Sequence, residues 1–143
     1  MGAKKDDRLH QLFLKGTLPK GLDGFYQGKL LTLIPANFVE LLGSIVSKFW
    51  LPWYGKEFYN EKQRGDNLLP FGIHIFPFQT RIKGGLKDDI RVMQLDYNIA
   101  ENPRKIRDGI DELVCVGRNK YLGKAYLKDG NDYRLVAFFS LEK

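Results

Sequence analysis

The stretch from residue 22 to residue 33 (LDGFYQGKLLTL) constrains the fold of this chain more than any other. A turn signal at Asp23 and Gly24 leads directly into a run of apolar and aromatic residues, which is typical of a strand. Within it, Gly24, Tyr26 and Gly28 follow the pattern Gly-x-Tyr-x-Gly. We therefore expect the first strand of a small, closed or nearly closed β-sheet here, with the rest of the chain supplying the other walls and a cover.

Strand signals recur at short intervals along the rest of the chain. The clearest is a final hairpin, in which strand runs at 121–127 and 133–141 flank a turn. Pro70 and Pro77 set the expected ends of a strand near 72–76, which residues 79–83 can extend, and the polar stretch 60–67 is expected to hold a turn. The other predicted strands cover 53–59, 90–97 and 110–116. Roughly six to eight short strands at this spacing favour an antiparallel barrel over βαβ units.

Two segments show helical periodicity. Residues 8–15 predict a short helix within an N-terminal arm that spans residues 1–21. Residues 36–50 carry a broad apolar stripe, and Pro52 ends that helix. The predicted fold class is therefore mainly β (α+β): a small antiparallel barrel with one covering amphipathic helix, in a single domain of residues 1–143.

Composition limits the functions that this chain can have. Cys115 is the one cysteine, so an internal disulfide is excluded. The sequence begins with no signal peptide and holds no apolar stretch that could span a bilayer, so we expect a cytoplasmic protein without integral membrane association. The net charge is +6, but the basic residues are scattered, which does not favour binding to nucleic acid.

Few residues offer catalytic or metal chemistry. The two histidines, His10 and His74, lie in different predicted elements, and no metal-ligand motif occurs, so we expect neither a metal nor a cofactor. His74, between two isoleucines, can be a core or rim histidine, a polar anchor for a ligand, or a general base. The last role requires an orienting carboxylate, for which the sequence offers Asp96, Asp111 and Glu112.

The sequence supports a binding site better than an active site. Aromatic residues make up 13% of the chain, and small barrels can enclose one ligand among inward side chains taken from alternate strand positions. Gly123 and Ala125 share a strand face and would leave room for a ligand. The predicted wall residues are Trp53, Phe76, Met93, Tyr97 and Tyr126, and the predicted polar anchors are His74, Arg91 and Lys124.

These features predict a non-enzymatic protein that binds a hydrophobic or amphipathic small molecule, lipid-like or fatty-acid-like, including molecules with an acidic head. Two alternatives stay open. One is a small barrel isomerase or hydrolase that acts on a lipid-like substrate with His74 as its base. The other is a protein-interaction domain that uses exposed aromatic residues from Trp50 to Tyr54.

Several short blocks resemble the GXWXG-type proteins and the uncharacterised domain often joined to that motif. Tyr26 stands where that family has tryptophan. The resemblance implies a lipocalin-like (calycin-like) barrel that binds an apolar or amphipathic small molecule, with Tyr26 closing one end beneath Arg134 of the last strand. The matching blocks are Gly24–Gly28, Trp53-Tyr54-Gly55-Lys56-x-Phe58, Asp96-Tyr97-Asn98, Asn102-Pro103, Asp111-Glu112-Leu113, Tyr121–Lys124 and Phe138-Phe139-x-Leu141.

Overall fold

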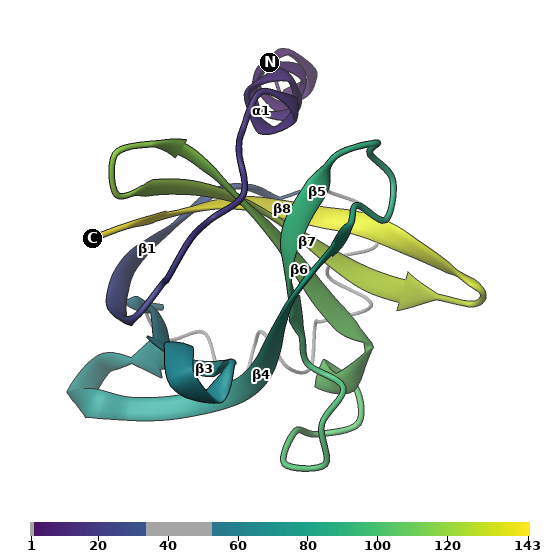
Figure 1. Ribbon diagram of the computed structural model, residues 1–143. Helices are drawn as coiled ribbons and strands as arrows, with labels where there is room; N and C mark the ends of the chain where they lie inside the picture. The colour runs from purple at the N-terminus through teal and green to yellow at the C-terminus, as the bar shows by residue number, and fades with distance from the viewer. Residues whose placement is uncertain (1, 34–52) are drawn as a thin grey trace.

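Eight β-strands form a closed antiparallel barrel in the computed structural model, which describes residues 2–33 and 53–143 (Figure 1). Each strand pairs with the next along the chain, and β8 pairs with β1. This arrangement confirms the predicted fold class, a small, mainly β barrel of the lipocalin-like kind with a helix on its outside. The strands are β1 (Gly24–Leu33), β2 (Gly55–Tyr59), β3 (Arg64–Leu69), β4 (Ile73–Gly84), β5 (Arg91–Asp96), β6 (Gly109–Gly117), β7 (Lys120–Asp129) and β8 (Asp132–Glu142), with short 3-10 helices η1 (Asn60–Lys62), η2 (Pro70–Gly72) and η3 (Ile106–Asp108) between them.

The helix α1 (Gly2–Leu14) lies outside the barrel and begins earlier than the helix predicted at 8–15 (Figure 1). Phe13 is its fully buried anchor, packed in an outer apolar cluster with Val92, Val114, Leu122 and Phe138. The predicted covering helix at 36–50 lies outside the described residues. No helix within the two described ranges is long and apolar enough to cross a membrane.

Aromatic rings dominate the inward-facing side chains of the barrel. Four rings form a row in which each meets the next edge to face, with 5.5 Å between the centres of neighbouring rings: Tyr26, Phe58, Phe78 and Tyr97. Such pairs stabilise a core by about 0.5–1.5 kcal/mol beyond the burial of their surface. Phe78 is fully buried in the same cluster, so this part of the interior is packed by the protein's own side chains.

Two glycines make room for the largest rings. A Cβ at Gly28 would lie 2.5 Å from the indole ring of Trp53, and a Cβ at Gly123 would lie 2.2 Å from the ring of Phe139. Trp53 and Phe139 in turn meet edge to face, with 5.8 Å between their ring centres. The second glycine of the Gly-x-Tyr-x-Gly pattern therefore lets an aromatic side chain pack directly on β1.

Two details of the predicted strands are wrong. The stretch 60–67 holds the expected turn, but at 60–63 rather than at Gly65 and Asp66, which lie in strand β3. Pro77 was expected to end a strand, but β4 continues through it. The pairing of β3 with β4 shifts register between Gly65 and Asn67, opposite Pro77, and a bulge of this kind tolerates a residue without a backbone N–H.

Candidate functional site

Four polar side chains meet inside the aromatic barrel, and we call them the interior polar cluster: Lys56, Asn67, Tyr97 and Asp111. Lys56 is 3% exposed, and the other three are also buried. Lys56 of β2 lies directly opposite Tyr26 of β1 and Asn67 of β3, and directly opposed residues in a sheet point to the same side. The sheet register therefore brings this cluster together from strands that are well separated in sequence.

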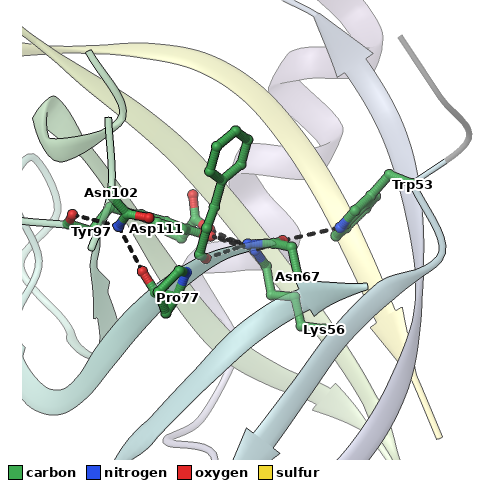
Figure 2. A network of polar contacts seen from close by, with 8 residues as sticks. Trp53, Lys56, Asn67, Pro77, Tyr97, Asn102 and Asp111 are labelled. Atoms are coloured by element: carbon green, nitrogen blue, oxygen red, sulfur yellow. Dashed lines mark hydrogen bonds and ion pairs between the residues drawn. The ribbon is translucent and has the colours of Figure 1, made fainter. Parts of the chain in front are cut away.

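Lys56 uses all three of its N–H groups inside the cluster (Figure 2). Its Nζ lies 2.8 Å from Asn67 Oδ1, 2.6 Å from Tyr97 Oη and 3.1 Å from Asp111 Oδ2. The Tyr97 hydroxyl donates to Asp111 Oδ2 at 2.9 Å, and the indole N–H of Trp53 donates to Asn67 Oδ1 at 3.0 Å. An ammonium group has three donors, so Lys56 is saturated by its own neighbours.

The surroundings of this ammonium group are aromatic. Its Nζ lies between 5.2 and 5.4 Å from the ring centres of Trp53, Phe78, Tyr97 and Phe139, within the range of cation–π attraction. Burial lowers the pKa of Lys56, although the Asp111 carboxylate opposes that change. Burial also raises the pKa of Tyr97 well above its usual value. The Lys56 ammonium and the Asp111 carboxylate thus form an ion pair that is buried among aromatic rings.

Across β7 and β8, the barrel wall next to Asp111 is made of small side chains, whereas the neighbour of Asp111 on β5 is the fully buried Leu95. Asp111 of β6 lies opposite Ala125 of β7, which lies opposite Ala137 of β8. Ala125 is partly buried against the interior cluster. The Asp111 side chain keeps 9% of its surface exposed, against 4% for Lys56. Of the two charged members of the cluster, the carboxylate is therefore the more accessible.

The connection from β5 to β6 is fixed against the same region (Figure 2). The side-chain amide of Asn102 donates to the backbone carbonyls of Pro77 and Tyr97, each at 2.8 Å. The guanidinium of Arg107 donates to the Asn102 carbonyl at 2.9 Å. These bonds hold Tyr97 in place at the point where the chain leaves β5.

Four of the predicted wall residues come together in this interior. Tyr97 belongs to the polar cluster, and Trp53, Phe76 and Met93 pack against the interior aromatic residues while staying partly exposed. The Asn67 amide donates to the Phe76 carbonyl at 3.0 Å, which ties that segment to the cluster. These four residues belong to three separate stretches of the chain.

Lys124 and Tyr126, also predicted to contact a ligand, lie on the outer side of the barrel. Lys124 Nζ donates to Asp88 Oδ2 at 2.7 Å, contacts His10 Nδ1 at 2.9 Å and lies 4.7 Å from the ring centre of Phe13 of α1. Burial raises the pKa of Tyr126, and the nearby carboxylates of Glu112 and Asp88 act in the same direction. Both residues belong to β7, which is apolar on both faces, so the sequence could not distinguish inward from outward positions.

Glu112 is a further buried member of this outer group. It lies opposite Lys124 in the register of β6 and β7, is fully buried, and accepts a hydrogen bond from the Leu86 N–H at 2.6 Å. Its Oε1 has no hydrogen-bond partner among the described residues. Burial raises the pKa of this carboxyl group.

His74 lies on the outer face of β4. Its Nδ1 is 2.8 Å from Asp66 Oδ1, and this hydrogen bond raises the pKa of the imidazole. The orienting carboxylate is therefore Asp66, which was not among the three candidates considered, and the His74 side chain is 43% exposed. Because His10 is a residue of α1, which lies outside the barrel, both histidines of the chain are outside the barrel interior.

Arg91 and Arg134 lie away from the interior polar cluster. Arg91 is exposed at the start of β5. Arg134 pairs with Asp129 near the β7–β8 turn rather than with Tyr26. The cation over the Tyr26 ring is instead Lys143, whose Nζ lies 5.1 Å from the ring centre. Of the proposed interaction surface, Trp50 lies outside the described residues and Tyr54 is 48% exposed.

The chain is similar in fold to a solved protein from Thermomonospora curvata. The two structures superpose with a TM-score of 0.60 over 96% of this chain and 86% of the other, at 16% sequence identity. A likeness at this identity concerns the fold alone and fits a lipocalin-like barrel at a coarse level. No family model matches the sequence, and no curated protein matches it, so the resemblance to GXWXG-type proteins stays a prediction.

Sequence reasoning missed Lys56 and Asn67 as site residues, and considered Asp111 only as a partner for His74. Each of these polar residues lies two positions before a buried apolar residue of the same strand: Phe58, Leu69 and Leu113. The sequence did contain a usable signal: residues two positions apart in a strand point to the same face, so a polar residue two positions from an inward apolar residue also points inward. A single polar residue at such a position also fits the end of a strand, and Asn67 was assigned to the polar stretch 60–67 for this reason.

Proposed function

We propose that the protein binds a hydrophobic or amphipathic small molecule non-covalently inside the barrel, beside the interior polar cluster. The observation that carries this proposal is the convergence of Trp53, Phe76 and Met93 on the interior. All three pack against its aromatic residues yet keep part of their surface exposed. Partly exposed apolar side chains on an interior wall are what a bound apolar molecule would cover.

The polar cluster fits this role because it is held in place by its own hydrogen bonds. A fixed polar group beside the small side chains of Ala125 and Ala137 offers one oriented contact in an apolar site, which is how such sites orient a ligand. The alternative of an enzyme with His74 as its base gains no support, since that imidazole lies on the outer face of β4 with Asp66.

The test is an equilibrium titration with the neutral fluorescent probe N-phenyl-1-naphthylamine. The probe should bind the wild-type protein saturably. The variant Met93→Trp should weaken binding at least about tenfold, which corresponds to about 1.4 kcal/mol, because the larger side chain fills space on the interior wall. Lys83→Trp is the matched control, because Lys83 is exposed on the neighbouring strand β4.

The proposal is supported if the probe binds saturably, if Met93→Trp weakens this binding, and if Lys83→Trp leaves the dissociation constant within about twofold of the wild-type value. A wild-type protein that shows no saturable binding overturns it. Equal binding by all three proteins also overturns it, because the probe would then be bound elsewhere.

A further inference from the structure

We infer that the site selects ligands whose polar end is a neutral hydrogen-bond donor, such as an alcohol or an amide, and rejects carboxylates. Asp111 is the residue that determines this specificity. The inference rests on the proposed function and names the ligand class for the same site. It departs from the sequence-based expectation that an acidic head is accepted.

Lys56 is the one cation of the interior polar cluster. Its three N–H groups are directed at Asn67, Tyr97 and Asp111. An acidic head group would have to displace one of these acceptors before it could pair with the ammonium. The side chain of Lys56 is 4% exposed, which leaves little surface for a new contact.

Asp111 contacts the rest of the cluster through one of its two carboxylate oxygens. Both of its interactions with the described residues, with Lys56 Nζ and with Tyr97 Oη, use Oδ2. The other carboxylate oxygen, Oδ1, is not used by these two groups, and the residues that follow Asp111 across β7 and β8 are the small Ala125 and Ala137. A carboxylate is an acceptor without donors, so its natural partner is an O–H or N–H.

The charge of Asp111 also disfavours an acidic head. An anionic head placed beside Asp111 would meet a like charge in a low-dielectric interior, where repulsion is much stronger than in water. The positive charge that could offset it is already neutralised by Asp111 itself. Repulsion of the wrong ligand combined with a matched contact for the right one is the usual origin of binding specificity.

The experiment compares 1-decanol with decanoate as competitors of N-phenyl-1-naphthylamine at pH 8, where the acid is ionised. The wild-type protein should bind the alcohol at least about tenfold more tightly than the acid. In Asp111→Asn the amide removes the negative charge but keeps the side-chain shape. The preference for the alcohol should then fall to within about threefold. Glu57→Gln, which changes a carboxylate next to Lys56 in β2, should keep the wild-type preference.

Each outcome bears on one of the two proposals. Equal or tighter binding of decanoate by the wild-type protein overturns this inference, even if Asp111→Asn does not fold. An unchanged preference in folded Asp111→Asn also overturns it. If the probe itself does not bind the wild-type protein, the proposed function fails, and the two failures are thereby distinguished.

Discussion

The ammonium group of Lys143 lies 5.1 Å from the ring centre of Tyr26 and donates a 2.7 Å hydrogen bond to the carbonyl of Asp23. Tyr26 belongs to the interior core, where its ring also meets those of Phe58 and Tyr121 edge to face. A cation from the residue that follows β8 therefore lies over the aromatic ring of β1. The resemblance to lipocalin-like barrels implied this arrangement, but it assigned the cation to Arg134.

The first prediction follows from this contact. Lys143→Met should lower the free energy of unfolding by about 0.5–1 kcal/mol, the value of a cation–π contact at an accessible site. Arg134→Met, measured by the same urea denaturation, should change it by less than about 0.5 kcal/mol, since that arginine pairs with Asp129 at the surface. A larger loss for Arg134→Met than for Lys143→Met would contradict the assignment.

The second prediction concerns the buried pair Lys56 and Asp111. Lys56→Met should destabilise the protein by about 3–5 kcal/mol, because it leaves the carboxylate buried without a positive partner. The double variant Lys56→Met, Asp111→Leu should recover part of that loss, since no charge is then left unpaired. Lys83→Met, at an exposed position, serves as the control. A double variant that is less stable than expected from the sum of the two single changes would contradict the pairing.

A third prediction tests the close contacts at two glycines. Gly28→Ala and Gly123→Ala should each destabilise the barrel by about 1–3 kcal/mol, because the added methyl group would meet the ring of Trp53 or of Phe139. Gly84→Ala is the matched control, since a Cβ there would have no atom within 4 Å. Thermal unfolding of the three variants provides the comparison, and equal stability of all three would show that these rings do not pack as described.

Much of the fold could be predicted from the sequence because local signals agree with it. Turn residues separate the strands, and the final hairpin has strong strand propensity on both sides of its turn. The polar interior could not be predicted in the same way. Lys56, Asn67 and Asp111 become neighbours only through the register of β2, β3 and β6, and register depends on pairing across the barrel.

The wrong prediction that Lys124 points into the barrel has a related cause. Along β7, Gly123 and Ala125 face the interior, so Lys124 between them faces outward. Because α1 covers the outer face of β7, both faces of this strand carry apolar residues. The alternation of residue types therefore does not show which face points into the barrel. The helix α1 that covers this face could be predicted only in part, because its first turns are charged.

The fourth prediction is a pH dependence that arises from Glu112. Burial raises the pKa of this carboxyl group above its ordinary value of 4.5, so the folded state holds the proton more tightly than the unfolded state. The stabilisation from Glu112 is therefore full below pH 4.5 and is lost as the pH rises through the folded-state pKa. Chemical denaturation of wild type and Glu112→Gln, compared between pH 4.5 and 7, measures this contribution.

The difference in unfolding free energy between the wild type and Glu112→Gln should move in favour of the variant as the pH rises. Carboxyl groups that lie away from Glu112 titrate equally in both proteins, so the difference reports on this residue and its immediate neighbours. A difference that stays constant with pH, or that moves in favour of the wild type, would show that Glu112 is not held in a desolvated site.

The central claim is that the barrel holds an apolar ligand against Trp53, Phe76 and Met93. Native mass spectrometry of the purified protein, before and after incubation with N-phenyl-1-naphthylamine, tests it most directly. We expect a one-to-one complex that dissociates on denaturation, either with a co-purified hydrophobic molecule or with the added probe. A mass equal to that of the chain alone under both conditions would contradict the account.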